Sequence, residues 1–94
     1  MSFLDFLKPK NPKIDLQKIP HHKYKMKNGK EMVVITSFGY PLSIAFSDGQ
    51  ILYVATERFN SSIRTMAERM YALKLFVEES SDIDDLKKTL SEYS

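Results

Sequence analysis

Residues 24–35 read YKMKNGKEMVVI, and this stretch decides how the chain begins to fold. Asn28-Gly29 separates two runs of residues that suit β-strands. Asn-Gly is the preferred pair for a two-residue hairpin turn, because both positions of that turn need a positive φ angle. The stretch therefore predicts a β-hairpin over residues 23–36.

The hairpin carries several lysines, and strand alternation predicts where they lie. Tyr24 and Met26 fall on one face of the first strand, and Lys23, Lys25 and Lys27 fall on the other. One face can then pack while the other presents ammonium groups, either to solvent or to a phosphate backbone. The candidate phosphate-binding lysines of this segment are Lys23, Lys25, Lys27 and Lys30.

The charge of the chain is unevenly distributed along its length. Residues 1–30 hold eight lysines against two aspartates, a net charge of +6, whereas residues 31–94 hold six basic and ten acidic residues, a net charge of −4. The net charge of +2 for the whole chain hides this difference. A polyanion would be attracted first to the N-terminal third.

The N-terminal residues differ in composition from the rest. Three of the four prolines, Pro9, Pro12 and Pro20, lie among lysines in residues 1–22, and proline removes a backbone donor and interrupts helices. We expect residues 1–22 to be a flexible basic leader and residues 23–94 to be a single small domain. A chain of 94 residues can bury roughly 60% of its unfolded surface, which suffices for one modest core.

Two structures fit residues 43–56. Asp48-Gly49 could form the turn of a second hairpin, because the apolar residues on both sides of it follow a period of two. Ser47-Asp48-Gly49-Gln50 also matches a capping box, in which the serine and glutamine side chains satisfy free amides at a helix start. The capping box favours a helix over about residues 48–59.

The C-terminal part of the chain predicts two further helices, over about residues 61–79 and 82–93. In the first, apolar residues recur at steps of three and four, and in the second Ser81 is a candidate cap before acidic residues of the first turn. The expected buried stripe of the first helix consists of Ile63, Met66, Ala67, Met70, Leu73 and Val77. The fold class is therefore α+β, with an N-terminal β-hairpin or small antiparallel sheet followed by two or three packed helices.

Several classes of function lack the residues that they require. The chain has no cysteine, only three glycines and only two histidines, His21 and His22, so that no metal-ligand spacing, glycine-rich phosphate loop or nucleophile paired with histidine is recognisable. No apolar run approaches the roughly 18 residues of a membrane span. We expect a cytoplasmic protein that is not an enzyme and has no metal, cofactor, small-molecule substrate or membrane partner.

Binding residues are more plentiful in the helix expected over residues 61–79. Hydroxyl and guanidinium groups gather in its N-terminal half, where free backbone amides and the helix dipole favour a phosphate. A guanidinium can also contact a guanine edge once such a helix lies in a major groove. The candidate DNA-binding residues of this region are Arg58, Ser61, Ser62, Arg64, Thr65 and Arg69.

Gly39-Tyr40-Pro41, followed about twenty residues later by the run from Ser62 to Phe76, resembles the N-terminal region of tyrosine recombinases, the phage integrase family. In that family a strand-rich start ends in a Gly-x-Pro turn and leads into a core-binding domain. One helix of that domain reads Ser-x-x-Thr, then an aromatic residue, then Leu-x-x-Phe. Ser62, Thr65, Leu73 and Phe76 match this pattern, whereas Arg69 stands where the family usually has an aromatic residue. The resemblance covers roughly residues 24–93.

The resemblance implies a DNA-binding N-terminal module of a recombinase, which positions double-stranded DNA without cleaving it. The family's catalytic residues belong to a separate domain with a His-x-x-Arg motif, and this chain contains no such motif. Other recombinase subunits are further expected partners. The alternative is a small adaptor or inhibitor of a mobile element, which would use the same methionine- and tyrosine-rich helix to bind a protein.

Overall fold

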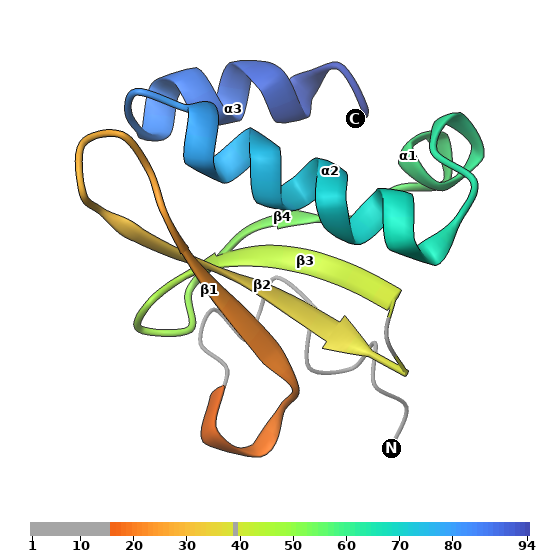
Figure 1. The fold of residues 1–94 in the computed structure, drawn as a ribbon, viewed down its shortest axis with the longest axis horizontal. Helices are drawn as coiled ribbons and strands as arrows, with labels where there is room; N and C mark the ends of the chain where they lie inside the picture. The colour runs from red at the N-terminus through yellow and green to blue at the C-terminus, as the bar shows by residue number, and fades with distance from the viewer. Residues whose placement is uncertain (1–15, 39) are drawn as a thin grey trace.

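The computed structural model describes residues 16–38 and 40–94, and Figure 1 shows four strands followed by three helices. The strands form one antiparallel sheet in the order β1-β2-β3-β4, so that each strand pairs with the next along the chain. The α+β class is thus confirmed. Of the two expected alternatives, a β-hairpin and a small antiparallel sheet, the structure has the sheet. The elements are a short 3-10 helix η2 (Leu16–Lys18), β1 (His21–Lys25), β2 (Glu31–Ser37), β3 (Tyr40–Phe46), β4 (Ile51–Val54), α1 (Glu57–Ser62), α2 (Met66–Glu79) and α3 (Ile83–Ser91).

The β1–β2 hairpin confirms the strands expected from the sequence but corrects their turn. Gly29 N–H donates to the Met26 carbonyl at 2.9 Å, and Met26 N–H donates to the Lys30 carbonyl at 2.9 Å. Three residues therefore form the loop, and only Gly29, at φ +86°, has the positive φ angle. The Asn28 side chain accepts from Lys30 N–H at 2.8 Å, which stabilises this longer turn without a positive φ at Asn28.

The helix expected over residues 48–59 is absent except for residues 57–59, which begin α1, because residues 43–54 form a second hairpin whose turn repeats that of the first. Gly49 N–H donates to the Phe46 carbonyl, Gly49 has a φ of +91°, and the Asp48 side chain accepts from Gln50 N–H at 2.9 Å. Residues 51–54 then form β4, which pairs with β3. The Asp-Gly turn and the pairing with β3 prevailed over the capping box.

The continuous helix expected over residues 61–79 is instead two helices with a break at residues 63–65. Thr56 caps α1 by accepting from Phe59 N–H, and Thr65 caps α2 by accepting from Glu68 N–H. Ile63 between them has extended backbone angles. The cap of the final helix is Asp82 and not Ser81, because the Asp82 side chain accepts from Asp85 N–H. The helix therefore begins one residue later than expected.

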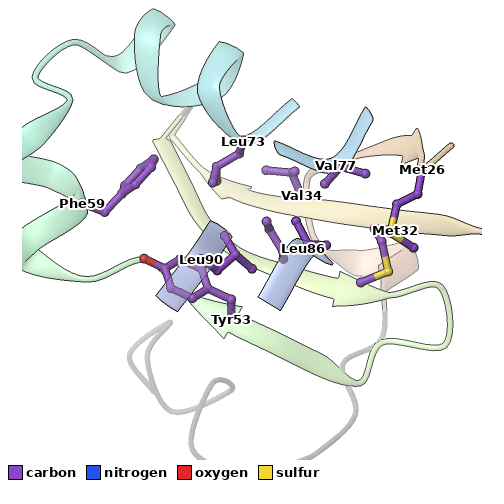
Figure 2. Packing of buried hydrophobic residues seen from close by; sticks show 10 residues of the cluster. Met26, Met32, Val34, Tyr53, Phe59, Leu73, Val77, Leu86 and Leu90 are labelled. Carbon is purple, nitrogen blue, oxygen red and sulfur yellow. The ribbon is translucent and has the colours of Figure 1, made fainter. Parts of the chain in front are cut away.

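The main core lies between the sheet and the helices. Figure 2 shows Leu73 and Val77 of α2 pointing toward Val34 of β2, with Leu86 and Leu90 of α3 beside them. Not all of the expected helical stripe is buried: Met66 and Ala67 are exposed, and Met70 is only half-buried. The break before Met66 explains the difference, because it shifts the start of the helix away from the core.

A second, smaller core covers the opposite face of the sheet. Val33, Ile35 and Ala45 are fully buried there, and Leu16 and Ile19 pack against them. Thr36 N–H donates to the Pro20 carbonyl at 2.9 Å, which ties the segment before β1 to β2. Residues 16–22, which we expected to belong to the flexible leader, therefore pack on the domain; the rest of that leader, residues 1–15, lies outside the described residues.

Candidate nucleic-acid interface

Lysines line strand β1, which is an edge strand of the described sheet because, among residues 16–38 and 40–94, it pairs with β2 alone. Lys23 and Lys25 are exposed, whereas Tyr24 between them packs against the main core, as the alternation predicted. Successive lysines on one face of a strand lie about 7 Å apart, since a strand rises about 3.4 Å per residue. This spacing is about twice the rise of about 3.4 Å per phosphate along the axis of one strand of duplex DNA.

The turn that follows β1 continues this basic edge. Lys27 and Lys30 are exposed, and Lys27 N–H donates to the Ser80 carbonyl at 3.0 Å, which fixes the turn beside the C-terminal end of α2. The Lys30 ammonium group lies 5.3 Å from the centre of the Phe46 ring. We call Lys23, Lys25, Lys27 and Lys30 the lysine edge.

The lysine edge keeps its charges available to a partner. Glu31 lies directly across from Lys25 in the sheet and is half-buried. Within residues 16–38 and 40–94, however, neither Glu31 nor any other acidic side chain forms an ion pair with the lysine edge. The charges can therefore interact with phosphates without first breaking a pairing within this part of the domain.

The other expected DNA-binding residues lie at the corner between α1 and α2, and not along one helix. Arg58 and Ser62 belong to α1, Arg64 lies exposed in the break, and Thr65 is the cap of α2. The Ser61 hydroxyl donates to the Glu57 carbonyl at 2.8 Å, within its own helix. The expected helical face that presents Arg64 and Thr65 together to a groove is therefore absent.

Arg69 has a structural role that the sequence did not suggest. Its Nε donates to the Ile63 carbonyl at 2.6 Å, and its Nη2 donates to the Asn60 carbonyl at 2.8 Å. The guanidinium also lies 5.9 Å from the centre of the Tyr40 ring. Arg69 thus satisfies two carbonyls at the end of α1 and lies beside Tyr40 of β3.

The structure separates the two groups of expected residues. The lysine edge ends beside Ser80, at the C-terminal end of α2, whereas Arg64 and Thr65 lie at its N-terminal end (Figure 1). The 14 residues of α2 span about 21 Å at about 1.5 Å per residue. The two groups therefore do not form one compact site.

A surface pocket of about 350 Å³ adjoins the α1–α2 corner, and sequence reasoning missed it. Tyr40, Asn60 and Arg69 line it, together with Phe38, whose side chain is 94% exposed and whose φ is +52°. The sequence signal for this pocket was Phe38 before Gly39, an aromatic residue at a place where the chain has to turn. This signal does not predict a pocket by itself, because α1 and α2 supply the other side of the pocket and no local pattern places them beside Phe38.

The remaining features of the described chain add no further candidate site. In residues 16–38 and 40–94, no three histidine, aspartate or glutamate side chains gather closely enough to hold a metal ion. No helix of that part has the length and apolar character needed to cross a bilayer. In comparisons with known proteins, no family model, no curated protein and no solved structure matches the chain.

Proposed function

We propose that the chain binds double-stranded DNA through the lysine edge, as the DNA-positioning N-terminal module of a tyrosine recombinase in the cytoplasm. The observation that carries the proposal is the run of exposed lysines along β1 and its turn, none of them in an ion pair within the described residues. The resemblance of residues 24–93 to the phage integrase family supports the same reading. Other recombinase subunits are the further partners of such a module, and DNA cleavage belongs to another domain.

The binding mode follows from the chemistry of the lysines. An ammonium group contacts phosphate oxygens as a point charge, and phosphate contacts fix the position of a protein on DNA without reading its sequence. Because β2 is buried within the sheet, only the exposed side of β1 and its turn can face the DNA. Binding through the lysine edge is therefore expected to be weak, similar for all sequences and strongly dependent on salt.

The test is a titration of a duplex at several salt concentrations with the parent chain and with Lys23→Gln/Lys25→Gln. Removing two phosphate contacts should reduce the slope of log K against log salt by about 1.8 and lower the affinity about tenfold per lysine at 0.1 M salt. The matched control is Lys87→Gln/Lys88→Gln, which removes the same charge from two exposed lysines of α3. An equal loss in both double variants would contradict the lysine edge as the site, and binding independent of salt would contradict the proposal as a whole.

A second candidate function is an adaptor or inhibitor of a mobile element, favoured by the apolar side chains that α2 exposes. Met66 is 44% exposed and Tyr71 is 61% exposed. Such a protein would change the rate of strand exchange by a complete tyrosine recombinase. Tyr71→Ser would then abolish that effect and leave DNA affinity unchanged, whereas the Lys23/Lys25 double variant would leave the effect intact.

A further inference from the structure

Phe38 occupies a position that suits an aromatic side chain poorly. Ser37 and Tyr40 are paired across β2 and β3, and Phe38 lies in the turn between them at φ +52°. Glycine and asparagine adopt this left-handed conformation far more readily than a bulky residue does. The phenyl ring also gains little from burial, since it is 94% exposed. Neither the turn nor the core explains a phenylalanine here.

The surroundings of Phe38 point to the kind of partner that it contacts. Tyr40 is 48% exposed beside it, and the guanidinium of Arg69 lies 5.9 Å from the Tyr40 ring centre. Two backbone carbonyls hold Arg69 in place, so the cationic side of the pocket is already formed. A combination of aromatic rings and a guanidinium is the chemistry that proteins use to stack nucleobases.

The pocket is large enough to hold a single base. Its volume of about 350 Å³ lies near the lower end of the range for small-ligand pockets, about 300–1,000 Å³. A duplex cannot enter such a space, but a single unstacked base can. Arg64 lies exposed next to Ile63, the residue whose carbonyl Arg69 binds. The exposed Glu68 in the first turn of α2 is the opposing charge in this region.

We propose that Phe38 and Tyr40 form a base-stacking site, in which one unstacked nucleobase of the bound DNA lies against the Phe38 ring in the pocket beside Arg69. This inference rests on the proposed DNA-binding function and adds the recognition of a deformed or unpaired position to it. Lys25 lies across from Glu31 at one end of β2, and Phe38 follows the other end. The lysine edge and the stacking site therefore lie toward opposite ends of β2, and the inference requires one duplex to reach both.

The experiment compares two duplexes of equal length, one fully paired and one with a single unpaired 2-aminopurine. The parent chain should bind the second duplex more tightly by about fivefold to a hundredfold, and the 2-aminopurine fluorescence should fall on binding because the base stacks on Phe38. Phe38→Asn should remove this preference and the fluorescence change, while its affinity for the paired duplex stays within about twofold of the parent. Because asparagine suits the turn, its thermal midpoint should not fall, which separates lost stacking from unfolding.

The control variants separate this inference from the proposed function. Tyr71→Ser removes another exposed aromatic ring, on α2, and should leave the preference for the unpaired base intact. Lys23→Gln/Lys25→Gln should weaken both duplexes equally and keep the preference. If Phe38→Asn keeps the preference, or weakens both duplexes equally, the stacking site is overturned while DNA binding stands. If the parent chain binds neither duplex and Phe38→Asn alters strand exchange, Phe38 contacts a protein and the inference is overturned.

Discussion

At the scale of single residues, Arg69 shows most clearly that the type of a side chain does not determine its role. A guanidinium near hydroxyl-bearing residues suggested a DNA contact, but two of its donors are used by the Ile63 and Asn60 carbonyls. These carbonyls lie where α1 ends and would otherwise lack a helical partner. The break between α1 and α2 thus depends on one side chain of the following helix.

We therefore expect Arg69→Ala to lower the free energy of unfolding by about 1 to 3 kcal/mol, the range for hydrogen bonds that involve a charged group. Urea denaturation measures the change. Arg69→Lys should not restore the stability, because an ammonium group cannot reproduce the planar pair of donors. Arg64→Ala is the matched control, since Arg64 is exposed in the break and its loss should change stability by less than about 0.5 kcal/mol. Equal effects of the two alanine variants would contradict the role given to Arg69.

At the scale of elements, the two hairpin turns have the same construction. In each, an Asn or Asp side chain accepts from the backbone two residues on, and a glycine closes the loop at a positive φ angle. The register of β1 with β2, and so the position of Lys23 and Lys25 on the edge, depends on the first of these turns. The turn therefore links local backbone conformation to the proposed DNA contact.

Gly29→Ala should lower the free energy of unfolding by about 1 to 2 kcal/mol, the cost of a left-handed backbone for a residue with a Cβ atom. No described heavy atom lies within 4 Å of a Cβ built at Gly29, so the cost arises from the backbone and not from a clash. Gly29→Asn should cost less, because asparagine tolerates this conformation. Thermal or urea denaturation checks the order of the three proteins, and an alanine variant as stable as the parent would contradict it.

Sequence patterns predicted correctly those elements for which the neighbouring residues favour a single structure. The Asn28-Gly29 hairpin and the inward direction of Tyr24 and Met26 follow from turn preference and strand alternation, and both are present. Residues 47–50 carried two local signals at once, and the choice between turn and cap was made by pairing with β3, a contact distant in sequence. Local patterns could not supply that contact.

The same limit explains what was missed at the candidate site. A threonine can cap a helix or lie within one, and Thr65 is a cap because α1 has already ended before it, where Arg69 donates to the Ile63 carbonyl. The pocket beside Phe38 needs β3, α1 and α2 together, so no single stretch of sequence encodes it. Residues of the lysine edge were identifiable because one strand and one turn position all of them.

At the scale of the whole molecule, β2 spans the distance between the two proposed contacts with DNA. Lys25 lies across from Glu31, where β2 begins, and Phe38 follows Ser37, where it ends. At about 3.4 Å per residue this distance is about 24 Å, which corresponds to about seven base pairs of duplex. Lys23 lies across from Val33, five residues before Phe38, so the near end of the lysine edge is about 17 Å from the pocket, which corresponds to about five base pairs. A shorter flank cannot reach the lysine edge while the unpaired base occupies the pocket.

Affinity should therefore depend on the length of paired DNA that flanks the unpaired base. We expect it to rise as one flank grows from about three to about five base pairs, when the flank reaches Lys23, and again up to about seven base pairs, when it reaches Lys25. Longer flanks should add only the gain that comes from more non-specific sites. Fluorescence anisotropy with duplexes closed by a loop at the far end measures this dependence. In Lys23→Gln/Lys25→Gln the increase of affinity with flank length should be much smaller, because the flank then meets fewer charges. Phe38→Asn should retain this increase and lose only the preference for the unpaired base. A parent affinity that is the same for flanks of about three and twelve base pairs would show that the two contacts do not act on one DNA molecule.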